Sequence, residues 1–154
     1  MRTTLMTIIL FGFSTMCIGQ TLVSVDTLDN GNVHVVTNEF ECVIFCPNNN
    51  SYHVGYSETK WMPTDEDVLL CDKIIRNFVN KKERKKAVVV GNSPIIHENF
   101  DKYVRQYMGY VDKHGRKILR VRYVWKEFLK DDKFQWLDHQ VGGIGGGTYF
   151  WQNF

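Results

Sequence analysis

The chain has 154 residues, of which 44% are hydrophobic and 23% charged, and its formal net charge is +2 at pH 7. This apolar content is ample for a globular core, which excludes a disordered chain. The near-neutral charge provides no long-range attraction to nucleic acid or anionic lipid, so we expect no nucleic-acid partner.

Residues 1–19 have the layout of a secretory signal peptide. A positive charge precedes the mostly apolar stretch Leu5–Phe13, which is too short to span a bilayer as a helix. Cys17 and Gly19 place small residues at the −3 and −1 positions of a cut before Gln20. Lipidation at the same cysteine is the alternative, but it requires a small preceding residue and the chain has methionine there.

The remaining residues, 20–154, have the length of one domain and contain no stretch with the apolar length of a membrane helix. We therefore expect one exported domain, periplasmic or secreted, with no integral membrane segment after the leader is removed. The chain stops inside the aromatic segment Thr148–Phe154 without a polar tail, a pattern expected of a C-terminal truncation.

Three cysteines follow the leader, Cys42, Cys46 and Cys71, so at least one has no partner within the chain. The first two lie four positions apart in a predicted strand, about 13 Å at the usual rise per residue. A disulfide requires Cα atoms within about 7 Å, so a bridge from either of them to Cys71 is the pairing that geometry allows. We expect free, buried thiols, because an odd count favours a packing role.

The N-terminal third predicts three strands. Thr21–Leu28 and Asn32–Asn38 flank Asp29-Asn30-Gly31, and Asn-Gly between extended runs is a strong hairpin signal. Glu39–Cys46 continues as a third strand until proline and asparagines end it.

One helix is predicted from Thr64 to about Lys82, with a threonine cap and an acidic first turn. Apolar residues recur at three- and four-residue steps, which predicts a stripe facing the core. The predicted stripe consists of Val68, Cys71, Ile74, Ile75, Phe78 and Val79. The basic run Lys81–Lys86 is interpreted as a solvated helix end rather than a lipid or nucleic-acid site, given the low net charge.

The clearest hairpin is Tyr103–Trp125, in which strand-favouring residues flank the turn Asp112–Gly115. One face of its second strand is apolar, while Arg120 and Arg122 point the other way. Phe134–Val141 and Thr148–Phe154 predict a last hairpin around a glycine-rich loop. The whole pattern predicts an α+β fold, with one main helix packed on a largely antiparallel sheet built of hairpins.

Catalytic chemistry finds little support in the sequence. The histidines do not have the spacing of metal ligands. The glycine-rich loop precedes a predicted strand, whereas a phosphate-binding loop precedes a helix. We therefore expect no metal, cofactor or catalytic residue. The alternative is a small hydrolase or thiol enzyme that uses Cys46, paired with His53, or His139.

A binding or interaction module is the favoured function, with Tyr103, Arg105 and Tyr107 as the contact residues. They share one face of a predicted strand, and tyrosine and arginine are common at the centres of interfaces. Such a face could dock a protein, a peptide or a glycan. Cross-strand packing of the same side chains for stability is the competing interpretation.

The hairpin also resembles a group of small uncharacterised exported bacterial proteins with the pattern Tyr-x-Arg-Gln-Tyr-x-Gly-Tyr, a glycine turn and a later aromatic strand. The matching residues are Tyr103, Arg105, Gln106, Tyr107, Gly109, Tyr110 and Gly115. The resemblance covers the last third of the chain and departs from the pattern at Asp138–Val141. It implies export from a bacterium and brings no activity with it.

Overall fold

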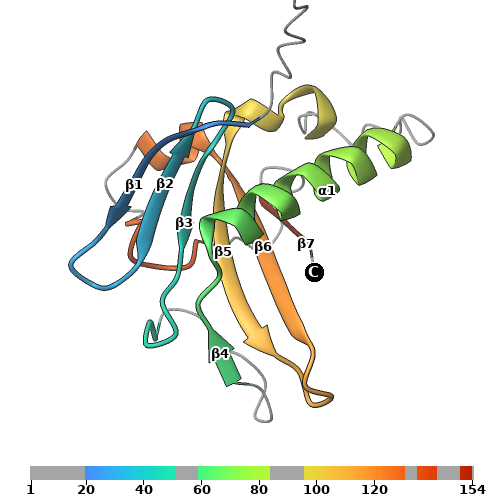
Figure 1. The fold of residues 1–154 in the computed structure, drawn as a ribbon. Helices are drawn as coiled ribbons and strands as arrows, with labels where there is room; N and C mark the ends of the chain where they lie inside the picture. The colour runs from blue at the N-terminus through green and yellow to red at the C-terminus, as the bar shows by residue number, and fades with distance from the viewer. Residues whose placement is uncertain (1–19, 51–58, 84–95, 131–134, 142–149, 154) are drawn as a thin grey trace, which may run out of the picture.

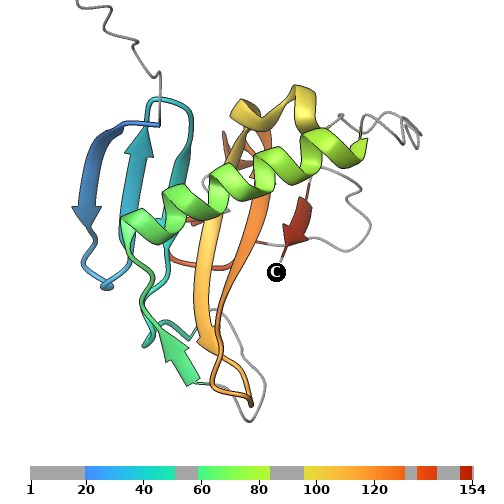
Figure 2. The same cartoon turned by 45° about the vertical axis from the view of Figure 1, so that its right-hand side comes forward.

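The computed structural model describes residues 20–50, 59–83, 96–130, 135–141 and 150–153. In these residues one α-helix lies across one face of a curled seven-stranded sheet, an α+β arrangement as predicted (Figures 1 and 2). The elements are β1 (Leu22–Thr27), β2 (Val33–Thr37), β3 (Glu41–Ile44), β4 (Thr59–Trp61), α1 (Asp65–Glu83), η1 (Ile96–Glu98), η2 (Phe100–Lys102), β5 (Tyr103–Val111), β6 (Lys117–Trp125), η3 (Lys126–Lys130) and β7 (Phe150–Asn153).

Most strand pairs are antiparallel, as predicted, but one pair is parallel, so the sheet is mixed and the prediction that it is built of hairpins is wrong. Its order is β1-β2-β3-β5-β6-β7, with β4 also paired to β5. The pair β3–β5 is parallel, in register from Cys42↔Arg105 to Ile44↔Tyr107, and the other pairs are antiparallel. A parallel pair needs a long crossover, and α1 lies in the connection between these two strands.

The two predicted hairpin turns are confirmed. Gly31 between β1 and β2 has φ of 80°, and Gly115 between β5 and β6 has φ of 77°, a left-handed conformation that glycine adopts without strain. The second turn is also held by Asp112, whose carboxylate accepts hydrogen bonds from the backbone N–H groups of His114 and Arg116, each at 2.9 Å. Hydrogen bonds from Arg116 lower the pKa of Asp112 to about 2.

The predicted cap of α1 is also confirmed. The Thr64 hydroxyl oxygen accepts a 3.2 Å hydrogen bond from the Asp67 backbone N–H, and the Asp67 carboxylate accepts one of 2.9 Å from the Thr64 N–H. This reciprocal arrangement satisfies two backbone donors that the first helical turn leaves without partners.

Helix α1 buries only part of its predicted stripe: the prediction is confirmed at Val68, Ile75 and Val79 and wrong at Ile74 and Phe78. Its buried residues are Val68, Asp72, Ile75 and Val79, at helical spacing. Ile74 and Phe78, which were expected to face the sheet, are 58% and 52% exposed, and Leu70 is 59% exposed. The helix is turned so that an aspartate faces the core, because Asp72 has a buried cationic partner there.

The C-terminal region also differs from the prediction. The described residues 135–141 form turns instead of a strand, and β7 pairs antiparallel with β6. The predicted leader (1–19) and the glycine-rich loop lie outside the described residues.

Turns 135–141 cover the sheet face opposite α1. Gln106 on β5 holds them there, because its side-chain amide donates to the carbonyls of Trp136 (2.7 Å) and His139 (2.8 Å) and its oxygen accepts from the Val141 N–H (2.8 Å). Trp136 packs against a small core that includes Met108. With both sheet faces covered, β5 is buried from Tyr103 to Tyr110.

Candidate functional site

The three predicted contact residues lie inside the protein. The side chains of Tyr103, Arg105 and Tyr107 have no exposed area, because they point from β5 into the core between the sheet and α1. The expectation that this strand face is open to a partner is therefore wrong. The structure agrees with the competing interpretation, packing for stability.

Arg105 is the centre of that core. Its Nε donates to the Asp72 carboxylate at 3.0 Å, and its Nη1 donates to the Tyr103 carbonyl at 2.7 Å. The guanidinium carbon lies 4.5 Å from the centre of the Phe40 ring and 5.3 Å from that of Tyr123, within the range of cation–π attraction. The charge is thus held by an opposite charge, a backbone carbonyl and aromatic faces.

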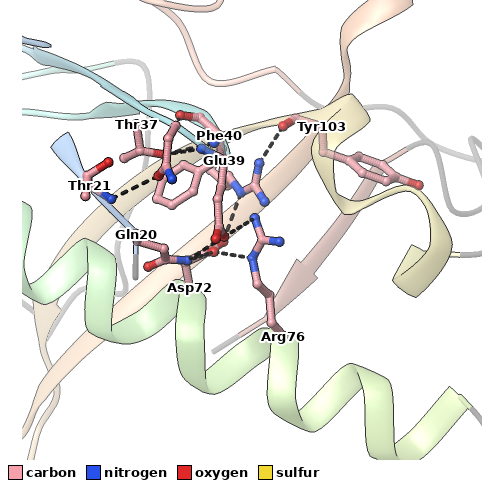
Figure 3. Close-up of polar contacts among 10 residues, drawn as sticks. Gln20, Thr21, Thr37, Glu39, Phe40, Asp72, Arg76 and Tyr103 are labelled. Atoms are coloured by element: carbon pink, nitrogen blue, oxygen red, sulfur yellow. Dashed lines mark hydrogen bonds and ion pairs between the residues drawn. The ribbon is translucent and has the colours of Figure 1, made fainter. Parts of the chain in front are cut away.

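The second oxygen of the Asp72 carboxylate also has hydrogen-bond partners, and these lie nearer the surface. This oxygen, Oδ2, accepts hydrogen bonds from Arg76 Nε (2.5 Å) and Gln20 Nε2 (2.8 Å) (Figure 3). Arg76 also lies 3.5 Å from Glu39, and its guanidinium carbon is 5.0 Å from the centre of the Phe100 ring. The network therefore ties the start of the described chain, the loop before β3 and helix α1 to strand β5.

The thiols and phenols near this pair are poor nucleophiles. Burial raises the pKa of Cys42 and of Tyr107 and Tyr123, and it raises the pKa of Cys71 to about 12. A thiol reacts as the thiolate, so Cys42 and Cys71 stay unreactive at neutral pH. The thiols of Cys42, Cys46 and Cys71 are free; Cys42 is buried as predicted, whereas Cys46 and Cys71 are only half-buried.

The residues of the enzyme alternative are not assembled by the described part of the chain. Cys46 is half-buried, and its thiol donates to the Asn30 carbonyl at 3.4 Å. His139 is exposed on turns 135–141, and His53 lies outside the described residues. Among the described residues no group of three His, Cys, Asp or Glu side chains could hold a metal ion, and no helix is long and apolar enough to cross a membrane.

Among the described residues, exposed large hydrophobic side chains lie on β1 (Leu22, Val23 and Val25), at Phe128 and, beside a groove, on α1. We call the surface on the helix the α1 face: Leu70, Ile74 and Phe78 on the helix, with Trp61 on β4 and Leu119 on β6 beside them. These residues line a groove of about 550 Å³ between the helix and the part of the sheet formed by the end of β4 and the start of β6. Asp67 and Lys117 are its charged lining residues.

The sheet wall of the groove is built around Trp61. Its indole Nε1 donates to the Tyr110 carbonyl at 3.2 Å, and Lys117 Nζ lies 4.7 Å from the centre of its ring. The ring lies flat over β5 because position 109 is glycine. A Cβ at Gly109 would lie 2.5 Å from the Trp61 carbonyl oxygen and 2.8 Å from its ring, closer than side chains tolerate. Glycine at position 109 is therefore required for Trp61 to form this wall of the groove.

Sequence reasoning missed the α1 face, although a signal was present. The helix carries more apolar residues than one core-facing stripe can hold, and Asp72 lies among them. Leu70, Ile74 and Phe78 recur every four residues and form a second stripe on an adjacent side of the helix. Two apolar stripes on one helix indicate two packing partners.

Comparison with known proteins supplies no family for this chain: no family model, curated protein or solved structure matches it.

The buried phenols and thiols predict a loss of stability at alkaline pH. Below pH 9 the folded and unfolded chains both keep these protons, so the groups have no effect. Above the unfolded pKa of 9.0 for cysteine and 10.0 for tyrosine, the unfolded chain releases protons that the folded chain retains. Each such group then lowers the free energy of unfolding by about 1.4 kcal/mol per pH unit.

Urea denaturation followed by far-ultraviolet circular dichroism between pH 8 and pH 11 measures this slope. The variant Tyr107→Phe removes one of the groups and also a buried hydroxyl that has no hydrogen-bond partner among the described residues. We expect it to be equal to or more stable than the native chain at pH 8, by up to about 1 kcal/mol, with a shallower loss above pH 10. Parallel pH profiles for the two proteins would contradict the burial of Tyr107.

Proposed function

We propose that the chain is an exported interaction module that binds a polypeptide through the α1 face. The observation that carries this proposal is the exposure of Leu70, Ile74 and Phe78 in one row beside an apolar groove. Large contiguous apolar patches on a soluble domain mark interaction sites, because leaving them in water is costly. The row follows the i, i+4, i+8 spacing with which one helix packs against another.

The lining of the groove favours a polypeptide over a glycan or a charged ligand. Its residues are mostly apolar, with four aliphatic side chains, one tryptophan and one phenylalanine, whereas a sugar site needs several convergent polar groups. Asp67 and Lys117 supply both signs of charge. An apolar helix or strand face with charged edges is the ligand that complements this surface.

Export rests on the signal-peptide pattern and is supported by the position of Gln20. This residue would be the first of the processed protein, and its side chain already donates to Asp72 at 2.8 Å and to Glu39 at 3.3 Å. The predicted cut therefore falls immediately before a residue that takes part in the folded network.

We expect cells that express the full chain to export a protein whose N-terminal peptide begins at Gln20, as measured by mass spectrometry of the exported fraction. Gly19→Phe, which places a bulky residue at the −1 position, should leave the uncut precursor behind. Gln20→Glu, one position later, should still be cut. An exported protein that retains residues 1–19 would contradict this part of the proposal.

A photo-crosslinking amino acid at position 78 tests the binding surface. In intact cells it should give a discrete adduct with a polypeptide, because Phe78 belongs to the proposed contact. The matched control carries the same crosslinker at Val23, which is also apolar and 67% exposed but lies on β1. Adding Leu70→Glu to the position-78 variant should abolish the adduct, since a carboxylate in an apolar contact is costly.

Equal labelling from positions 78 and 23, or an adduct that survives Leu70→Glu, would overturn the proposal. Circular dichroism and urea denaturation of each variant verify that it is folded. Leu70 is already largely exposed, so its replacement should change the free energy of unfolding by no more than about 0.5 kcal/mol.

A further inference from the structure

We infer that the partner of the α1 face is a second copy of this chain, joined by antiparallel packing of the two α1 helices about a two-fold axis at Ile74. This inference rests on the proposed function, since it uses the same face, and it specifies the occupant. The apolar positions of the helix and its charges both support it.

The exposed row of α1 is symmetric about its central residue. Leu70 and Phe78 lie four positions before and after Ile74, and α1 itself runs from Asp65 to Glu83, which places Ile74 at its midpoint. A two-fold axis through this point pairs Ile74 with Ile74 of the partner subunit. It also pairs Leu70 with the partner's Phe78, so all three exposed apolar side chains are covered by one contact. Such a self-complementary surface is what a two-fold interface requires.

The net charges of the two ends of the helix are opposite in sign. Its first turn contains Asp65, Glu66 and Asp67, and its last turn has the sequence Asn80-Lys81-Lys82-Glu83. The two-fold operation brings the acidic turn of one copy beside the lysine-bearing turn of the other. The helix dipoles are then antiparallel as well, which is the favourable arrangement. A parallel pairing would instead place like charges together at both ends.

The groove beside α1 suits this partner. Trp61 and Leu119 form its sheet wall, and a second helix lying along the exposed row would contact that wall with its own apolar side chains. The contact involves one helix and its flanks, which is below the size of most permanent dimer interfaces. We therefore expect an association that depends on protein concentration.

Cysteine crosslinking tests the position of the axis. I74C in a C46S background places two thiols next to each other across the axis, so mild oxidation of the purified protein should give a disulfide-linked dimer. The matched control is K73C in the same background, because Lys73 is exposed on α1 one residue away and lies on a different side of the helix. It should stay largely monomeric under the same conditions.

Sedimentation equilibrium without crosslinking gives a second measurement. The native chain should shift from monomer to dimer between about 1 µM and 1 mM, the range of weak complexes. I74E should weaken dimerisation by more than about 100-fold, because two carboxylates would meet at the axis. V23E, a charge placed on exposed β1, should leave it unchanged.

Equal crosslinking of I74C and K73C, or a native chain that stays monomeric across this range, overturns the inference of a second copy. If the crosslinker at position 78 then captures a different polypeptide in cells, the interaction module stands and only its partner was wrongly assigned. If that crosslinker captures nothing, both proposals fail.

Discussion

The structure depends on one buried ion pair, between Asp72 on α1 and Arg105 on β5. Both side chains are fully buried, and each charge would be expensive to leave alone in the core. Because only one rotation of the helix brings Asp72 to Arg105, the pair fixes which side of α1 faces the sheet. That rotation turns Leu70, Ile74 and Phe78 away from the core and creates the α1 face.

The environment of the pair makes this constraint strict. The rings of Phe40, Phe100 and Tyr123 surround the Arg105 guanidinium. Arg76 and Gln20 donate hydrogen bonds to the second oxygen of the Asp72 carboxylate, so water has little access to either charge. Replacing Asp72 leaves the buried Arg105 charge uncompensated, which typically costs about 3–5 kcal/mol, whereas replacing Arg105 leaves Asp72 paired with Arg76. Apolar packing alone tolerates small helix rotations, whereas a hydrogen-bonded ion pair does not.

Features that depend on neighbouring residues could be predicted from the sequence. The turns at Gly31 and Gly115 and the Thr64 cap each follow from local backbone chemistry, and each is confirmed. The parallel pair β3–β5 and the rotation of α1 depend on contacts between distant segments. Asp72 and Arg105 are 33 positions apart in the chain. The sequence around each residue therefore does not indicate that the other one neutralises its charge.

The candidate site was misplaced for the same reason. An arginine between two tyrosines on a strand normally faces water, since arginine is rarely buried without a partner. Because Asp72 is that partner, Arg105 and its tyrosine neighbours are buried, and Leu70, Ile74 and Phe78 of α1 are exposed. The exposed α1 face is therefore a consequence of how the buried charge of Arg105 is neutralised.

A double-mutant cycle measures whether Asp72 and Arg105 act as one unit. The free energy of unfolding is measured for the native chain, Asp72→Ala, Arg105→Ala and the double variant. The double variant should be no less stable than the worse single variant, with a coupling energy of at least about 2 kcal/mol. Additive losses, with a coupling energy near zero, would contradict this prediction.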